Sequence, residues 1–276
     1  MARLLVVLVT LFYHSFAFAQ QSPPTSQADQ VGQLPWTLFG TGKIGDQASI
    51  SVQSGYAFVS GNAARRFIEL MGNPGRDNLS IYGPRPLNWF AVFAFEDSGY
   101  VKDDEKLNPD ELLGILRESN LASQAERKRL GLEQLTLQGW AVPPHYDLVT
   151  KRLEWGTRLT DEKQHEVVNY TIKILGRQGV MNAVLVSEPA SLEQDIADFK
   201  KSLLGYEFDE GKRYSEFRAG DKLAEYGLAA LIVGGAAAAA AKGGLFNGLG
   251  KLLLVGGLGL LALLAKGFRS IFNRTR

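Results

Sequence analysis

The C-terminal end of the chain is the feature that most constrains its architecture, because it is far more apolar than the region before it. Two apolar runs occur there, Tyr226 to Ala241 and Leu252 to Ala265, and basic residues follow the second. A helix needs about 20 residues to cross a bilayer, so each run alone is short for a span. Extending the second run back to Gly244, or the first back to Leu223, reaches that length. We therefore expect residues 221–276 to form a membrane anchor with a basic tail.

The N-terminus has the three parts of a secretory signal peptide. Arg3 supplies a positive charge, Leu4 to Phe12 form a short apolar stretch, and Ala17-Phe18-Ala19 places small residues before a cleavage position. The apolar stretch is shorter than a membrane-spanning helix. We therefore expect residues 1–19 to be removed before Gln20, and an uncleaved N-terminal anchor is the alternative.

Together the two ends predict a location at the bacterial inner membrane, with the main domain on the periplasmic side. Export places the central residues outside, whereas the basic tail favours the cytoplasmic side. One crossing satisfies both tendencies, and a helical hairpin that returns the tail to the outside is the alternative. Small residues in the apolar runs, such as Gly234-Gly235 and Gly256-Gly257, permit close helix contact and a homo-oligomer.

Charge and cysteine content exclude several classes of function. Residues 20–220 carry 22 Lys and Arg against 27 Asp and Glu. A mildly acidic domain lacks the basic face that nucleic-acid binding needs, so we expect no nucleic-acid partner. The chain has no cysteine, which removes disulfides, thiolate metal sites and thiol catalysis.

Hydrophobic periodicity predicts an α+β domain with an antiparallel sheet built from hairpins over residues 34–220, after a flexible leader over residues 20–33. Strands are expected in pairs with turns between them. They are Gln47 to Val52 with Tyr56 to Val59, Leu135 to Val142 with Arg152 to Leu159, and Glu166 to Leu175 with Val180 to Val186. In the second pair, we expect Trp140 to lie opposite Trp155. Trp89 to Phe95 is apolar on both faces, as a central strand would be.

Helices are predicted between and after these strands. Ser60 precedes an apolar stripe of Ala64, Phe67, Ile68 and Met71. Asn108-Pro109-Asp110-Glu111 combines a capping side chain, a proline and acidic residues, and so predicts a helix that runs to about Leu130. A third helix carries Leu192, Ile196, Phe199 and Leu203 on one stripe and ends at Gly205.

The loop Pro143-Pro144-His145-Tyr146-Asp147 is the most distinctive candidate for chemistry. It presents an imidazole, a phenol and a carboxylate together, and Glu154 is expected across the hairpin. In a hydrolase, His145 or Glu154 would act as the base and Asp147 would orient the imidazole. The alternative is a rigid turn whose tyrosine and histidine cover the end of the sheet.

Two other motifs lack the context that their chemistry requires. Gly40 to Gly45 matches G-x-G-x-x-G, but the segment after it is predicted to be a strand rather than the helix that meets a pyrophosphate. The acidic stretch Asp97 to Glu105 lacks the ligand spacing of a calcium loop. We therefore expect neither a cofactor nor a metal ion.

Several stretches occurring together resemble a bacterial family of uncharacterised membrane-anchored proteins that is defined by a domain of unknown function. The stretches that carry the resemblance are Leu34-Pro35-Trp36, Gly45-Asp46-Gln47-Ala48, Asn88-Trp89-Phe90, Ser98-Gly99-Tyr100-Val101, Gly139-Trp140, Pro143-Pro144-His145-Tyr146-Asp147, Leu153-Glu154-Trp155-Gly156-Thr157, Val168-Asn169-Tyr170 and Gly220-Asp221-Lys222. The resemblance implies an envelope location and a C-terminal anchor, and it brings no reaction or ligand.

The function expected from these observations is that of a membrane-tethered envelope protein whose exported domain binds or scaffolds a protein partner. The motivation is a domain without a recognisable catalytic set beside an apolar anchor. The alternative is an envelope hydrolase that uses His145, Asp147 and Glu154. A structure separates the two, because the hydrolase requires these three side chains to converge in a pocket.

Overall fold

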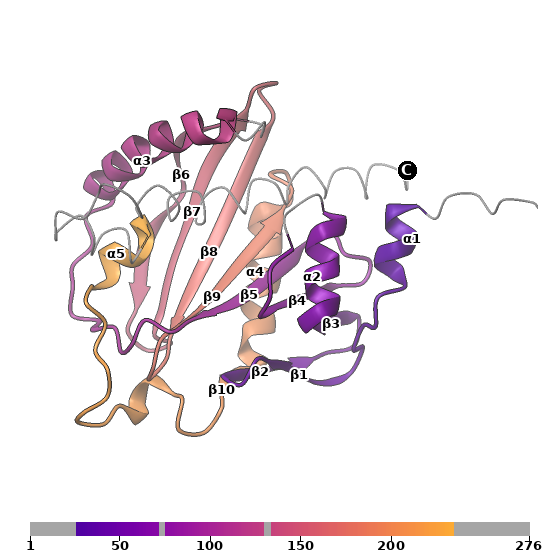
Figure 1. Ribbon diagram of the computed structural model, residues 1–276, viewed down its shortest axis with the longest axis horizontal. Helices are drawn as coiled ribbons and strands as arrows, with labels where there is room; N and C mark the ends of the chain where they lie inside the picture. Colours follow the sequence, from indigo (N-terminus) through magenta and orange to yellow (C-terminus); the bar gives the residue numbers. More distant parts are fainter. Residues whose placement is uncertain (1–25, 72–74, 130–133, 235–276) are drawn as a thin grey trace, which may run out of the picture.

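The computed structural model describes residues 26–71, 75–129 and 134–234, and it confirms an α+β domain with antiparallel sheets (Figure 1). The strands are β1 (Gly40–Ile44), β2 (Ala48–Val52), β3 (Tyr56–Ser60), β4 (Leu79–Pro84), β5 (Phe90–Glu96), β6 (Leu135–Asp147), β7 (Arg152–Asp161), β8 (Glu166–Leu175), β9 (Val180–Ser187) and β10 (Tyr206–Phe208). The α-helices are α1 (Gln27–Gly32), α2 (Gly61–Leu70), α3 (Pro109–Arg129), α4 (Leu192–Ser202) and α5 (Leu228–Val233). The expected signal peptide at residues 1–19 and most of the expected anchor lie outside these residues.

The large sheet has seven strands in the order β3-β4-β5-β9-β8-β7-β6, and every pairing is antiparallel. The expected β8–β9 hairpin is confirmed, with Leu175 opposite Val180. The strand expected at Trp89 to Phe95 is β5, which lies between β4 and β9 and buries Phe90 to Phe93 on both faces. A strand covered on both sides needs apolar residues at successive positions, which explains its continuous pattern.

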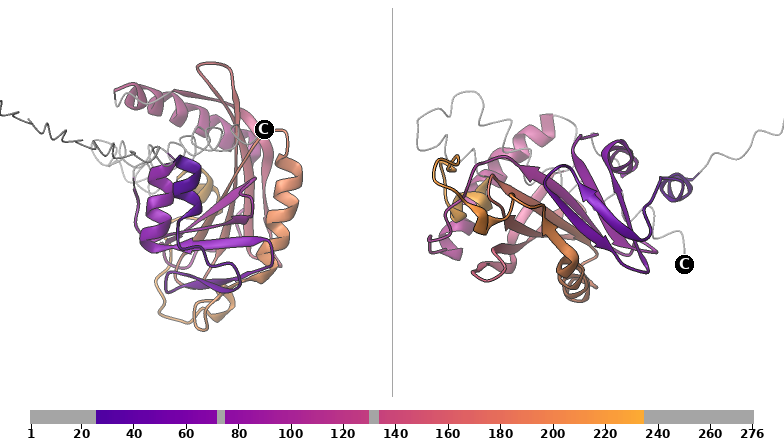
Figure 2. Two further views of the ribbon diagram at one scale, coloured as in Figure 1. Left: turned by 90° about the vertical axis from the view of Figure 1, so that its right-hand side faces the viewer. Right: turned by 90° about the horizontal axis from the view of Figure 1, so that it is seen from below.

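Helices and a small second sheet cover the two faces of the large sheet. Figure 2 shows α4 on one side of the sheet and α1 with α2 on the other. The core on the α4 side also receives residues of the three-stranded sheet β1-β2-β10, such as Ile50 and Phe208. On the opposite face, α3 and α5 pack over β6 and β7, and α2 packs over β3 and β4.

The expected hairpin between residues 47–52 and 56–59 is wrong, although both strands exist. β2 pairs with β1 and β10, whereas β3 pairs with β4 in the large sheet. Gly55, with φ +84°, turns the chain between them. Ala57, Phe58 and Val59 are buried in succession, so β3 needs cover on both faces and lies in the large sheet.

The predicted helices are confirmed, with one difference in capping. Residues Ala64, Phe67, Ile68 and Met71 are buried as the stripe predicts, but the Ser60 side chain makes no capping hydrogen bond. In α3, Asn108 Oδ1 accepts the Glu111 N–H at 3.4 Å. The helix expected to end at Gly205 is α4, followed by a 3₁₀ turn over Leu203–Gly205.

The expected pairing of Trp140 with Trp155 is wrong, because β6 is irregular. Three shifts of register interrupt the β6–β7 ladder, and Trp140 lies opposite Thr157 instead. Pro143 and Pro144 fall in this irregular stretch, where proline can be tolerated in an edge strand because it cannot donate a ladder hydrogen bond. The indole N–H of Trp140 donates to the Pro109 carbonyl at 3.1 Å, which joins β6 to the start of α3.

Ordered structure extends beyond both expected limits of the domain. Within the leader expected over residues 20–33, Ser26 and Asp29 form a capping box at the start of α1, and Val31 is buried. At the other end, α5 buries Leu228 and Leu231 against the domain. No helix in the described part of the chain has the length and apolar character of a membrane span.

Candidate functional site

The β6–β7 hairpin brings two of the three predicted site residues together. His145 lies directly opposite Glu154 in the ladder, and His145 Nε2 is 3.4 Å from Glu154 Oε2. The imidazole is half exposed, whereas the carboxylate is buried, with only 3% of its side chain exposed. Facing positions in an antiparallel pair share one face of the sheet, which is why the sequence could predict this contact.

Glu154 is held by two further groups that sequence reasoning missed. Its Oε2 atom accepts hydrogen bonds from the Tyr170 hydroxyl on β8 and from Lys200 Nζ on α4, each at 2.6 Å. Burial and the bond to Glu154 raise the pKa of the Tyr170 phenol above its ordinary value. A carboxylate that is buried and paired with an ammonium group holds α4 against the sheet, and it is poorly placed to remove a proton from a substrate.

Asp147 serves the turn that follows β6. Its Oδ1 atom accepts the backbone N–H groups of Val149 at 2.8 Å and Thr150 at 3.0 Å. These bonds lower the pKa of the Asp147 carboxyl below its ordinary value. A hydrolase would need Asp147 to orient the His145 imidazole. In the structure, Asp147 Oδ1 instead caps backbone N–H groups of the turn.

Tyr146 lies on the opposite side of the same strand end. Its hydroxyl donates to Asp103 Oδ2 at 2.9 Å, and Lys151 Nζ lies 2.7 Å from the same oxygen. The Lys151 ammonium also sits 5.1 Å from the ring centre of Tyr214, which stacks on Tyr100 at 4.4 Å. This cluster ties the turn after β6 to the segment that follows β10.

An open groove with a volume of about 720 Å³ lies beside this turn. The residues that line it come from the turn before β7 and the start of β7, the end of β8, β10 and the segment after β10, together with Tyr100 from the segment after β5. The lining includes Val149, Lys151 and Arg152 from the hairpin, Tyr206 and Phe208 from β10, and Arg213, Tyr214 and Phe217 from the following segment. The groove is therefore surrounded by aromatic rings, three cationic side chains and one acidic residue, Glu207. Its volume is in the range that small ligands occupy.

Two buried polar atoms in the groove lining have no hydrogen-bond partner among the described residues. They are Arg152 Nε and the hydroxyl oxygen of Tyr206. The same guanidinium does donate from Nη2 to the Leu203 carbonyl at 3.0 Å. Burial raises the pKa of the Tyr206 phenol well above its ordinary value, while the charge of Arg152 acts in the opposite direction. A buried donor without an acceptor is costly, so each of these two atoms calls for a structural explanation.

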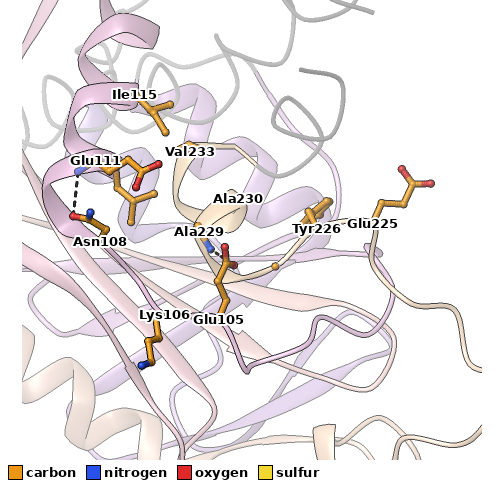
Figure 3. A pocket seen from close by; sticks show the side chains of 12 residues that line it. Glu105, Lys106, Asn108, Glu111, Ile115, Glu225, Tyr226, Ala229, Ala230 and Val233 are labelled. Carbon is orange, nitrogen blue, oxygen red and sulfur yellow. Dashed lines mark hydrogen bonds between the residues drawn. The ribbon is translucent and has the colours of Figure 1, made fainter. Parts of the chain in front are cut away.

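A second, smaller cavity of about 250 Å³ lies between the start of α3 and α5 (Figure 3). Its lining includes the apolar residues Leu112, Ile115 and Val233 together with Glu105. Glu105 Oε2 accepts the Ala229 N–H at 2.9 Å, as Figure 3 shows, so this carboxylate caps the first turn of α5. The pocket therefore follows from how α5 is attached to the domain.

The sequence contained only a faint signal for the groove. Lys151 and Arg152 are adjacent after a turn, and aromatic residues recur between Tyr206 and Phe217. Nothing in local spacing indicates that these two segments meet. Among the described residues, no group of three His, Cys, Asp or Glu side chains is placed to hold a metal ion.

Comparison with known proteins gives a family but no activity. No curated protein matches the chain. The solution structure of cyanobacterial PsbP (CyanoP) from Synechocystis sp. PCC 6803 is similar over 59% of this chain and 88% of that chain, at 12% identity and a TM-score of 0.35, and this likeness is too low to carry an argument. The model of the family described as "Protein of unknown function (DUF2167)" matches residues 39–265, and the chain belongs to this family.

Proposed function

We propose that the chain is an exported, membrane-tethered protein whose domain binds a protein partner through the groove beside the β6–β7 turn. The observation that carries this proposal is the combination of exposed apolar side chains with the cationic, aromatic groove at one end of the sheet. Val149 is 91% exposed, Leu148 is 65% exposed and Phe217 is 39% exposed. Exposed apolar side chains gathered beside a groove are typical of interaction surfaces.

The arrangement of the three candidate catalytic residues also favours binding over hydrolysis. Glu154 is paired with Lys200, and Asp147 caps a turn. His145 is therefore left with a buried carboxylate that already has a cation. The hydrolase remains the weaker proposal because a base needs a lone pair aimed at bound substrate.

The location follows from the two ends of the sequence and is part of the same proposal. We place the domain on the periplasmic side of the bacterial inner membrane, after cleavage before Gln20. Leu228 and Leu231 belong to the beginning of the first apolar run, and both are buried in the domain. The beginning of that run is therefore part of the folded domain. This favours the second run, extended back to Gly244, as the single crossing. Contact between small residues of neighbouring anchors would then permit a homo-oligomer.

Two experiments test the proposal. A photo-crosslinking side chain at Val149 in intact cells should capture a discrete partner, whereas the same group at Leu121 on α3, which is 67% exposed, should not. Equal capture from both positions, or none from Val149, would contradict the groove as a binding surface. Reporter fusions after Gly234 and after Arg276 should give an outside and an inside signal, respectively. Two outside signals would indicate the helical hairpin, and two inside signals would contradict export.

A further inference from the structure

Two of the side chains that line the groove carry buried hydrogen-bond donors without partners in the described part of the chain. Arg152 and Tyr206 both line the groove, and the buried Nε–H of Arg152 and the buried hydroxyl of Tyr206 are donors without a partner among the described residues. Leaving a buried donor unpaired is energetically costly. Two such donors beside one groove indicate a place where an acceptor oxygen binds.

The surroundings of Arg152 indicate a carboxylate rather than a phosphate. The charges of Glu154 and Asp147 act on the Arg152 guanidinium, so negative charge is already present nearby. The other two cations of the lining already have carboxylate partners, Asp103 for Lys151 and Glu207 with Glu216 for Arg213. Arg152 is therefore left to balance a single negative charge on a ligand. Two donors from different side chains also suit the two oxygens of a planar carboxylate.

The rest of the groove indicates what is attached to that carboxylate. Phe208, Tyr214 and Phe217 provide apolar and aromatic surface within the same 720 Å³. The last residue of a peptide carries its carboxylate and its side chain on one carbon, so one residue can reach both the donors and the rings. Peptide C-termini are captured elsewhere by backbone N–H groups, and here two side-chain donors would take that role.

We infer that the groove binds the C-terminal carboxylate of a partner peptide that ends in an apolar or aromatic residue, with Arg152 Nε and the Tyr206 hydroxyl as donors. This inference rests on the proposed function, because it names the partner chemistry of the same groove. Both donor atoms lie beneath the groove surface. Binding therefore requires a local displacement that brings these two atoms to the groove surface.

The test uses the full chain labelled with ¹⁵N-arginine and three probes: N-acetylphenylalanine, its uncharged amide, and phenyl phosphate. The Arg152 Nε–H resonance, assigned with Arg152→Lys, should shift on addition of N-acetylphenylalanine and stay unchanged with the amide. Arg158→Lys alters another arginine of β7, which pairs with Glu166, and should bind N-acetylphenylalanine as the unmodified chain does. Equal responses to acid and amide, or tighter binding of phenyl phosphate, would overturn the assignment.

A second test of the inference uses Tyr206→Phe, which removes only a hydroxyl that lacks a partner among the described residues. It should weaken N-acetylphenylalanine binding by about fivefold or more and leave the unfolding midpoint unchanged. Tyr82→Phe removes another buried hydroxyl from the same core, away from the groove, and should leave binding unchanged. Unaltered binding by Tyr206→Phe, or a clear loss of stability, would show that the hydroxyl serves another purpose and would contradict the inference.

The two proposals fail in different ways. If the Val149 crosslink captures a partner but N-acetylphenylalanine does not bind, the groove is a binding surface with another ligand chemistry. If N-acetylphenylalanine binds but Val149 captures nothing in cells, the carboxylate site stands and the proposed partner-binding function falls.

Discussion

Lys200 on α4 and Glu154 on β7 form an ion pair of 2.6 Å that fixes the helix to the sheet. The two ends of the pair differ in exposure, since 3% of the Glu154 side chain and 40% of the Lys200 side chain are exposed. Removing the lysine leaves a buried charge, whereas removing the carboxylate leaves a lysine that can turn to water. The two substitutions should therefore have unequal costs.

We expect Lys200→Met to lower the free energy of unfolding by about 2–3 kcal/mol, and Glu154→Gln by about 1 kcal/mol. The glutamine can still accept the Tyr170 hydroxyl, which limits its cost. Urea unfolding followed by tryptophan fluorescence measures both. Lys201→Met alters the next, exposed lysine of α4 and should be nearly neutral. Equal losses at the two lysines would contradict a specific role for the pair.

The Arg177–Asp221 pair should make stability depend on pH in the acidic range. Arg177 donates from Nε and Nη2 to the two oxygens of Asp221, each at 2.7 Å, and this pairing lowers the pKa of the Asp221 carboxyl from 3.8 to about 2. The folded state therefore holds this proton less tightly than the unfolded chain. The stabilisation is present above about pH 4 and is lost as the pH falls towards about 2.

Asp221→Asn should accordingly be less stable than the unmodified chain near pH 6, and the difference should shrink as the pH falls from about 4 to about 2. Unfolding midpoints across this range test the expectation. Asp97→Asn alters an exposed carboxyl, and its difference in stability from the unmodified chain should not shrink as the pH falls. A difference that stays constant down to about pH 2 would mean that the pair does not hold the segment after β10 in solution.

Asn120 on α3 should protect the free edge of β6. Its amide donates to the Leu135 carbonyl at 2.9 Å and its oxygen accepts the Leu137 N–H at 3.0 Å, so one side chain satisfies two backbone groups of an edge strand. Asn120→Leu leaves the Leu137 N–H unpaired and the Leu135 carbonyl with only the 3.4 Å bond from Gln124, and it should cost about 1–3 kcal/mol. Asn120→Asp should keep the bond to Leu137, but its buried carboxylate cannot donate to the Leu135 carbonyl and should also lower stability.

Hydrogen exchange at Leu137 checks this expectation, because Asn120→Leu should accelerate it and Asn120→Asp should largely preserve its protection. Gln124→Leu provides a neighbouring control, since its amide reaches Leu135 only at 3.4 Å. If Leu137 exchanges at the same rate in both Asn120 variants, the edge is protected by α3 packing alone.

The parts of the fold that depend on near neighbours could be predicted from the sequence. The β8–β9 hairpin follows from two apolar strands around a glycine-containing turn, and the start of α3 follows from Asn108 and Pro109. Contacts between distant segments could not be predicted. The three-residue strand β10 has too little pattern of its own, and its pairing with β2 depends on where α4 ends.

In the candidate site, too, contacts within a hairpin could be predicted from the sequence, and contacts between distant segments could not. His145 and Glu154 could be placed together because a hairpin sets which residues face each other. Lys200 reaches Glu154 only through the packing of α4, and that packing determines whether the carboxylate is free or paired. The groove was missed because Arg152 and Tyr206 meet across segments whose sequence spacing carries no signal.

The folded domain extends past the C-terminal limit that the sequence predicts for it. The sequence placed it at Gly220, but Leu228, Leu231 and Ile232 are buried, and the Tyr226 hydroxyl donates to Glu96 Oε1 at 2.7 Å. Burying each aliphatic side chain stabilises by about 1.5–3 kcal/mol. A typical domain is stable by only about 5–15 kcal/mol, so these residues supply a large share.

A version of the chain that ends at Gly234 should therefore unfold cooperatively, whereas one that ends at Gly220 should lose about 4 kcal/mol or more, or fail to fold. Leu231→Ala in the longer version isolates the packing of α5 and should cost about 2–4 kcal/mol. Leu223→Ala, at a side chain that is 47% exposed, provides the matched control and should be close to neutral. Equal stability of the two shortened versions would show that α5 adds nothing to the domain, and the first apolar run would then be free to enter the membrane.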